Sequence, residues 1–589
     1  MARLLSFSLA LLVAVYGSAA GAGDEDPFPY LEDLPLEIRE GGEWDPEDAP
    51  LPLLSRDPAV GRWGARRIGE ARRALSPPEL RRLWWEIRGS PGGRWGGLLL
   101  NGKGSGSLLL RERQLLSSAG LRRIDLLQWE RGELGARIAA ERDPGERRWN
   151  DFFSWSATWN SPSDAVRVVA GDMAVRLGSG LLVGTSTPYG PPSPTGSFRA
   201  SRLGLYGSRL ESDAHHGVGA LFPALGGRWI ILVTSTRRDA RVDDEGRVSS
   251  IDRSGLHRTP SEEGRRDRLH ERIGALRYET GRGALSLGVT GAAAGFHPSL
   301  GGGDLRRKPK AFQGDRLGAW AFEFRWREGW YDVAGEVGAS TTGGAAGRLL
   351  LRLSSGRTRF SFRFRNFSGR FHAPRGTVYH RIGGEPSGEI GAIFGGRTVV
   401  GGRVKMEGRL HLYSSFDRTY QSAGPVAGRE MEVRWELLRR RLSPYLRIRR
   451  AAKVEGPLDE RRRSSSQALS LGVEAKRGAS RLRLDGKWKG DVSCTGEREG
   501  SAALALLVST DAERWGRLAL SIIRVRDGGL PLLLPAASLP RTASVEWFGG
   551  GRGKGGLFFA WSRPLGRIAE AALSAGPGTA AFEISLQVF

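Results

Sequence analysis

Residues 320–327 read Trp-Ala-Phe-Glu-Phe-Arg-Trp-Arg, so that apolar and polar side chains alternate along them. Successive side chains of a β-strand point to opposite faces. One face of this segment would carry Trp320, Phe322, Phe324 and Trp326, and the other would carry the charges, Arg325 among them. The segment therefore predicts a strand that separates two very different environments.

The same pattern recurs at residues 357–365, Arg-Thr-Arg-Phe-Ser-Phe-Arg-Phe-Arg. Phe360, Phe362 and Phe364 would share one face and Arg363 would lie on the other. Similar short segments, separated by Gly, Asp, Ser and Pro, continue from about residue 151 to the end of the chain. We interpret residues 151–589 as one β domain.

Both a soluble sandwich and a transmembrane barrel contain such strands. Arginine on the polar face of several strands, aromatic residues at strand ends and the lack of an internal repeat favour the barrel. At roughly 25–30 residues per strand and connection, the domain has room for about 14–18 strands. The predicted fold class is mainly β: a transmembrane antiparallel β-barrel with a small N-terminal α-helical domain.

The two ends of the sequence support export to a membrane. Residues 1–22 combine a basic start, a short apolar core and small residues before a cleavage site, as in a signal peptide. The last strand-like segment, residues 581–589, ends on Phe589, one residue out of phase with its apolar face. A terminal Phe resembles the assembly signal of bacterial outer-membrane barrels. We therefore expect an outer-membrane location.

Between these ends, residues 23–55 form an acidic, proline-containing linker, and residues 56–90 are basic and helical in character. Residues 91–150 are mixed, and we predict that they form a connecting or plug segment. Cys494 is the single cysteine, so an internal disulfide is excluded. The eight histidines are scattered, so we expect neither a metal site nor a cofactor.

Three stretches resemble a family of bacterial outer-membrane proteins that join an N-terminal helix-hairpin-helix segment to a β-barrel. The first is residues 171–183, Gly-Asp-Met-Ala-Val-Arg-Leu-Gly-Ser-Gly-Leu-Leu-Val, in which Met173 replaces an aromatic residue. The second, residues 254–262, is Ser-Gly-Leu-His-Arg-Thr-Pro-Ser-Glu, and the third is Phe-Arg-Asn-Phe-Ser at 364–368. The resemblance implies an outer-membrane barrel with a periplasmic N-terminal domain.

The second stretch is too polar, and too rich in turn residues, to be a strand. Its motif residues are Ser254, Gly255, Leu256, His257, Arg258, Thr259 and Pro260. The run Thr259 to Glu262 predicts the cap of a helix that starts near Ser261. His257 and Arg258 are candidates for contact with an anionic ligand. The alternative is a loop that anchors the mouth of the barrel and shapes its lumen.

Residues 58–72 carry the resemblance to the helix-hairpin-helix segment, although Ala59 replaces the first glycine of the hairpin. In such a hairpin, backbone N–H groups bind a phosphate without reading bases, and nearby arginines add salt-sensitive attraction. The candidate phosphate- or DNA-binding residues are Val60, Gly61, Arg62, Arg66, Arg67 and Arg73. The alternative is a degenerate hairpin that serves as a periplasmic adaptor or plug.

The net charge of +25 is compatible with a polyanionic ligand, and also with arginine on the inward and loop faces of a barrel. No nucleophile elbow, phosphate-binding loop or zinc signature is present, so we expect no enzyme and no catalytic residues. One predicted function is binding or uptake of a polyanion, DNA included, or of a periplasmic partner. The other is a passive or anion-preferring pore. Expected partners are outer-membrane lipid, lipopolysaccharide and the barrel-assembly machinery.

Overall fold

The structure is a computed structural model. It describes residues 106–117, 120–143, 145–146, 151–162, 165–185, 201–206, 214–252, 255–301, 310–381, 387–419, 422–438, 442–455, 462–477, 480–493, 498–512, 516–526, 532–535, 545–548, 555–564, 569–576 and 579–588. The signal peptide, the acidic linker, the helix-hairpin-helix segment, Ser254 and Phe589 lie outside these residues, and so do the predictions made for them. Among the described residues, no helix has the length and apolar character needed to cross a membrane.

The described strands form one 27-stranded sheet and a separate hairpin of β25 (Leu532–Pro535) and β26 (Val545–Phe548). Three short strands lie beside the main circuit of the sheet: β6 (Arg202–Leu205), β9 (Ala240–Val242) and β10 (Val248–Ile251). In the described part of the chain, the circuit therefore has 24 strands, each antiparallel to its neighbours.

The first half of the circuit runs from β1 to β15. Its strands are β1 (Gly106–Ser117), β2 (Gly120–Arg131), β3 (Leu134–Arg142), β4 (Phe152–Asn160), β5 (Arg167–Arg176), β7 (His215–Ala224), β8 (Gly227–Arg238), β11 (Leu269–Arg282), β12 (Leu285–Leu300), β13 (Gly314–Glu328), β14 (Tyr331–Ser340) and β15 (Ala345–Ser355).

The second half runs from β16 to β29. Its strands are β16 (Thr358–Phe367), β17 (Glu389–Val400), β18 (Val404–Thr419), β19 (Ser422–Leu437), β20 (Leu442–Glu455), β21 (Arg462–Arg477), β22 (Ser480–Val492), β23 (Arg498–Ala512), β24 (Gly516–Arg526), β27 (Gly555–Pro564), β28 (Ala569–Gly576) and β29 (Thr579–Val588).

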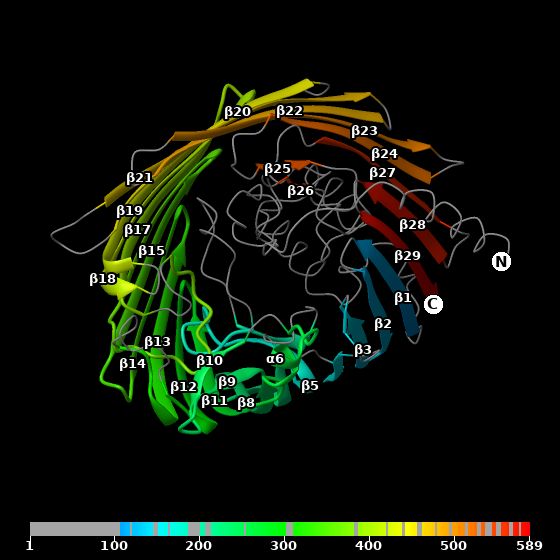
Figure 1. Cartoon of the computed structure of the whole chain (residues 1–589). Helices are drawn as coiled ribbons and strands as arrows, with labels where there is room; N and C mark the ends of the chain where they lie inside the picture. The colour runs from blue at the N-terminus through cyan, green and yellow to red at the C-terminus, as the bar shows by residue number, and fades with distance from the viewer. Residues whose placement is uncertain are drawn as a thin grey trace. The chain divides into compact units, whose positions relative to one another are not determined.

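The sheet closes on itself because its first and last strands pair. β1 and β29 are antiparallel partners from Leu108 opposite Val588 to Ser117 opposite Thr579, and Figure 1 shows the two strands side by side. Closure leaves no unpaired strand edge. The predicted antiparallel β-barrel is confirmed.

Two details of the prediction were wrong. The circuit has 24 strands in place of about 14–18, and it begins at Gly106 in place of residue 151. The repeat is shorter than assumed because many strands are joined by tight turns, such as Leu225-Gly226, where both residues have positive φ. Residues 106–142, predicted as part of a connecting or plug segment, form β1–β3 of the barrel wall.

The two ends of the barrel differ in their connections. At one end, tight turns join the strands, for example residues 329–330 between β13 and β14 and 356–357 between β15 and β16. The other end carries the longest connections, for example residues 239–268 between β8 and β11, together with a few short ones such as 341–344. β1 starts at the short-turn end because it runs antiparallel to β29. We call the two ends the short-turn end and the long-connection end.

The alternating strands orient as predicted. In β16, the exposed fractions of Phe360 and Phe364 are 57% and 37%, whereas those of Ser361 and Arg365 are 6% and 5%. In β13, Arg325 donates to Asp332, a buried residue of β14, at 2.8–3.0 Å. Phenylalanine therefore faces outward and arginine faces the interior of the barrel.

Part of the interior is filled by connections that fold inward. Residues 177–183, which follow β5, include the buried Leu177, Leu181, Leu182 and Val183. They pack with Phe371 and Val378, from the connection after β16, and against small and aliphatic side chains of the wall. Those wall residues are Ile230, Leu232, Ile273, Ala275, Ala292, Ala294, Leu317, Ala319 and Ala321. The two inward segments also pair directly, Val183 with Arg375.

Candidate functional site

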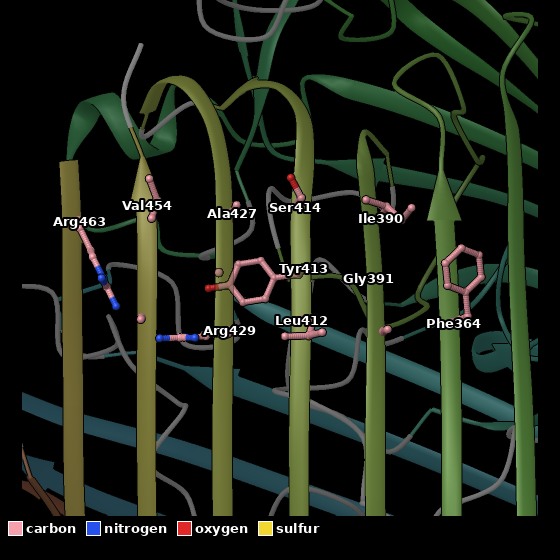
Figure 2. Close-up of a pocket in the computed structure, with 13 residues that line it drawn as sticks. Phe364, Ile390, Gly391, Leu412, Tyr413, Ser414, Ala427, Arg429, Val454 and Arg463 are labelled. Atoms are coloured by element: carbon pink, nitrogen blue, oxygen red, sulfur yellow. The ribbon is translucent and has the colours of Figure 1, made fainter. Parts of the chain in front are cut away.

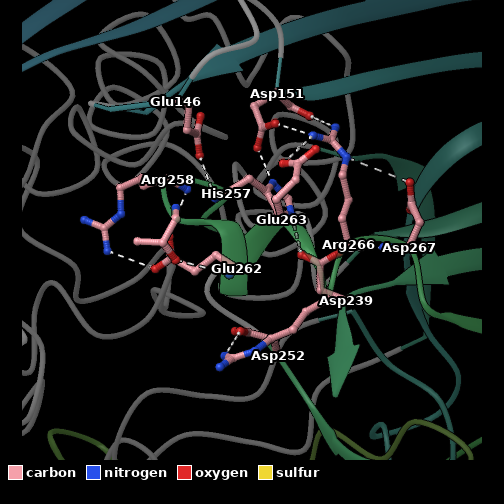
Figure 3. A network of polar contacts seen from close by, with 12 residues as sticks. Glu146, Asp151, Asp239, Asp252, His257, Arg258, Glu262, Glu263, Arg266 and Asp267 are labelled. Carbon is pink, nitrogen blue, oxygen red and sulfur yellow. Dashed lines mark hydrogen bonds and ion pairs between the residues drawn. The ribbon is translucent and has the colours of Figure 1, made fainter. Parts of the chain in front are cut away.

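The motif loop, residues 255–268, lies at the long-connection end, between the loop after β3 and Asp239, the residue that follows β8. Figure 3 shows its polar side chains gathered around His257. The loop contains one turn of helix, α6 (Pro260–Glu263), with Thr259 as N-cap. The Thr259 side chain accepts from Glu262 N at 3.2 Å, and Glu262 accepts from Thr259 N at 3.0 Å. The predicted helix cap is confirmed.

Glu262 also fixes the start of the helix. Its carboxylate accepts from the backbone N–H of Arg258 at 2.8 Å. Desolvation acts to raise the pKa of Glu262, but the N–H groups of Arg258 and Thr259 and the Arg258 guanidinium outweigh it, so that the pKa is lowered. Arg258 therefore pairs within its own loop.

The His257 ring is buried between two aspartates. Nδ1 contacts Asp151, which follows the β3–β4 loop, and Nε2 lies 2.9 Å from Oδ2 of Asp239, which follows β8. Ionised carboxylates only accept hydrogen bonds, so both contacts form when both ring nitrogens carry protons. Asp151 accepts in addition from Arg266 Nη1 at 2.5 Å. One imidazole thus links three segments that are far apart in the sequence.

Glu146, Asp151 and His257 are close enough together to resemble a metal centre. Every carboxylate oxygen of the cluster nevertheless has a hydrogen-bond donor. Glu146 accepts from Asp143 N at 2.7 Å and from His257 N at 3.3 Å. Asp239 accepts from Asp267 N at 2.9 Å through the oxygen that His257 leaves free. The Arg266 guanidinium already supplies positive charge, and the carboxylate oxygens already have hydrogen-bond partners, so the donor set does not fit a cation.

Burial shifts the pKa values of two carboxyl groups in this cluster. It raises the pKa of Glu146, and the neighbouring Asp151 and Asp143 add to the effect. Burial also raises the pKa of Asp239, against the opposing influence of Asp267 N–H and His257. Ionisation of these two carboxyls is therefore costly.

The geometry agrees with the anchoring alternative for this loop. His257 is buried and both its ring nitrogens are occupied, which leaves it no contact for an anionic ligand. Gly255 has a φ of 63°, a left-handed conformation that suits glycine. Ser261 Oγ accepts from Arg265 at 3.4 Å. Leu256, Thr259 and Pro260 belong to the framework of the same loop.

The glycines of the first motif make sense inside the barrel. Gly178 and Gly180 have φ of 57° and 92°, and a Cβ at Gly178 would overlap the Glu323 carboxylate and the Arg277 guanidinium. Between them, Ser179 donates to Glu336 and accepts from Arg348. The motif is therefore a turn whose backbone lies against the ion pairs of the wall. The Gly-Ser-Gly spacing was the signal for it, and the sequence did not identify its partners.

A second polar region covers the inner face from β16 to β22. Arg365, in the third motif, donates to Glu389 at 2.6 Å and approaches Nε2 of His411 to 2.9 Å. Arg381 donates to Glu430 at 2.8 Å. These groups lie on neighbouring strands or on the inward segment, so they form a continuous charged surface. We call this surface the charged wall.

The charged wall continues across β19 and β20. Glu432 accepts from Arg409 at 3.2 Å and from Arg447 at 2.8 Å, and Arg449 lies 3.7 Å from Glu430. On β22, Arg483 pairs with Asp485 at 2.6 Å. Arginine suits such a surface because its charge persists and its fork contacts two acceptors at once.

Comparison with known proteins gives structural neighbours only. No known family and no curated protein matches the sequence. The FrpB iron transporter from Neisseria meningitidis matches at 10% identity over 82% of this chain and 81% of its own, with a TM-score of 0.37. The siderophore receptor PirA from Pseudomonas aeruginosa matches at 6% identity over 82% and 80%, with a TM-score of 0.40.

A third neighbour is OccK11 (OpdR) from Pseudomonas aeruginosa, at 10% identity over 82% of this chain and 96% of its own, with a TM-score of 0.29. With TM-scores of this size, the barrel is established by strand pairing within the chain and not by these neighbours.

Proposed function

We propose that this protein is an outer-membrane β-barrel that admits anionic solutes along the charged wall of its lumen. The observation that supports the proposal is the closed circuit of strands with apolar side chains facing outward and ion pairs facing inward. Exposed outward residues on successive strands are Val289, Trp320, Val337, Leu349, Phe360, Phe394, Leu410, Met431, Ile448, Leu471, Leu482 and Leu504. An exposed apolar band of this extent matches a lipid environment and would be costly in water.

The balance of inward charge favours anions. Alternation and strand register place fifteen basic residues on the inner face of β16–β22 among the described side chains: Arg359, Arg363, Arg365, Arg397, Lys405, Arg409, Arg434, Arg447, Arg449, Lys453, Arg462, Arg481, Arg483, Lys487 and Lys489. The same rule places nine acidic residues there: Glu389, Glu407, Glu430, Glu432, Glu436, Glu455, Glu474, Asp485 and Asp491. The excess of positive charge would concentrate anions at this wall.

The short-turn end would face the periplasm, because β1 starts there and the preceding residues join the barrel at that end. Binding of DNA or another polyanion by Arg66 and Arg67 remains a separate hypothesis about residues outside the described part. We do not expect an enzyme: in the described residues His257, the histidine of the motif loop, serves as an anchor.

Two measurements test the proposal. The full chain, isolated from membranes, should migrate differently on gels before and after boiling, as closed barrels do. In a planar bilayer with a salt gradient it should give a reversal potential of the sign expected for anion preference. Absence of the gel shift would refute the membrane barrel, whereas a cation-selective current would refute only the role of the charged wall.

A further inference from the structure

A groove of about 650 Å³ runs across the outer face of β16–β21, near the long-connection end (Figure 2). We propose that this groove binds a phosphorylated glycolipid of the lipid A type, with a phosphate held by Arg429 and Arg463. The inference rests on the proposed function, since it requires the outer face to lie in an outer membrane.

The groove exists because small side chains occupy several outward positions on β17, β19 and β20. Ala392, Ala427 and Ala452 belong to β17, β19 and β20, and all three line the groove. Larger apolar residues border them, Phe364 and Leu412 among them, and both are exposed. The hollow is therefore wide, shallow and apolar. An acyl chain that lies in it exchanges contacts with other lipid for close packing against the protein.

The two charged side chains that line the groove, Arg429 and Arg463, are both positive. Arg429 faces Ala452 across the strand pair, and Arg463 faces Val454, so the two arginines flank β20 two positions apart. Both side chains are exposed, and Figure 2 shows the two guanidinium groups directed toward each other over β20. Within the described residues, no carboxylate pairs with either of them. The neighbouring outward position on β20 is another exposed arginine, Arg450.

Exposed arginines on an outward, lipid-facing surface need an anionic partner at the depth of the headgroups. Guanidinium groups bind phosphate oxygens with two parallel hydrogen bonds, and the binding is stronger where water is scarce. In the proposed orientation the long-connection end meets the outer leaflet, whose phosphate-bearing lipid is lipopolysaccharide. The apolar floor and the two neighbouring cations together therefore fit lipid A better than a free anion, because a free anion would make no contact with the apolar floor.

The test measures retention of lipid A by the full chain in detergent micelles, using native mass spectrometry. The double variant Arg429→Gln/Arg463→Gln should bind about tenfold more weakly than the parent protein, because two charge-assisted contacts are lost. Arg282→Gln is the matched control, since Arg282 is an exposed arginine on the outer face at the short-turn end. The control should bind like the parent protein.

Two further arms separate the possible failures. Ala452→Trp fills the floor of the groove and should also weaken binding, although both arginines remain. The parent protein should bind lipid A that lacks its phosphates about tenfold more weakly than intact lipid A. The double variant should bind the two lipids equally. Equal retention of lipid A by parent and double variant would overturn the inference, and so would equal retention of both lipids. If the variants keep the gel shift of a closed barrel, the proposed membrane barrel stands whatever the lipid result.

Discussion

The inner face of the barrel has two regions built on opposite chemistry. From β5 to β14, small and aliphatic residues such as Ile230 and Leu317 face inward toward the long-connection end, where the inward segments at residues 177–183 and 371–378 cover them, and ion pairs such as Arg325–Asp332 lie toward the short-turn end. From β16 to β22, the charged wall faces inward with Arg365, Glu430 and Glu432. The first region is closed by its own chain, whereas the second is held by ion pairs.

Under the proposed function, this difference would let one barrel be both stable and permeable. Apolar wall residues force connections to fold onto them, because exposed apolar surface in a water-filled lumen is costly. Buried ion pairs contribute less to stability, since desolvation offsets much of their attraction. We therefore expect mutations in the filled region to change stability and conductance together, and mutations in the charged wall to change selectivity first.

The largest effect should come from placing a charge under the inward segment. Leu182→Asp buries an unpaired carboxylate among Val183, Phe371 and their neighbours, and should destabilise this packing by about 4–5 kcal/mol. Hydrogen exchange of residues 177–185 should become fast and single-channel conductance should rise. Leu182→Met, which keeps the volume, is the control. Unchanged exchange in the Asp variant would show that the segment does not depend on this packing.

The next effect tests the anchor of the motif loop. His257→Ala removes the bridge between Asp151 and Asp239 and leaves both carboxylates short of a donor, at a cost of about 3 kcal/mol. Hydrogen exchange of residues 255–268 should accelerate. Ser235→Ala, on the outer face of β8, should leave it unaltered. If the loop stays protected from exchange without His257, the remaining contacts of Arg266 are sufficient to order it, and His257 is not the anchor.

A smaller effect separates the two faces of one strand. Arg449 faces the charged wall and Arg450 faces outward on β20. Arg449→Gln should lower the anion-to-cation permeability ratio by about twofold, whereas Arg450→Gln should not change it. Reversal potentials in a potassium chloride gradient give the ratio for both variants. Equal shifts in the two variants would mean that the charged wall does not line the conducting path.

The smallest effect concerns pH. Burial raises the pKa values of Glu146 and Asp239 above their unfolded values, so the stability they contribute is present below the unfolded pKa and is lost as pH rises through the folded value. Protection of the motif loop should thus decline modestly as pH rises above the ordinary carboxyl range of about pH 4. Glu262, whose pKa is lowered, contributes with the opposite sign.

Glu146→Gln is the matched variant for this pH effect. It removes one of the two raised carboxyls and keeps one acceptor oxygen, which can serve Asp143 N, the donor at 2.7 Å, while the weaker contact with His257 N at 3.3 Å is lost. Hydrogen exchange of residues 255–268 should then vary less with pH. A steeper dependence in the variant would contradict the assignment.

Local periodicity was sufficient to predict the strands and their faces. Phe360 and Phe364 could be assigned outward from alternation alone, because side-chain direction in a strand depends only on position. The capped turn at Thr259 was equally local. Strands β1–β3 escaped prediction since their alternation is weak: Ile124 and Leu126 face inward while Leu127 and Trp129 take the alternate positions, so both faces carry apolar residues.

What the sequence by itself determined is therefore the antiparallel β character of the chain, the two faces of its clearly alternating strands and the cap of α6, all properties of neighbouring residues. Only the tertiary structure decided the number of strands in the circuit, the pairing of His257 with Asp151 and Asp239, and the site of Ser179 beside Glu336 and Arg348. These contacts join residues up to 169 positions apart in the chain. Closure of the sheet brings them together, and no local pattern encodes which distant strands it will place on facing walls.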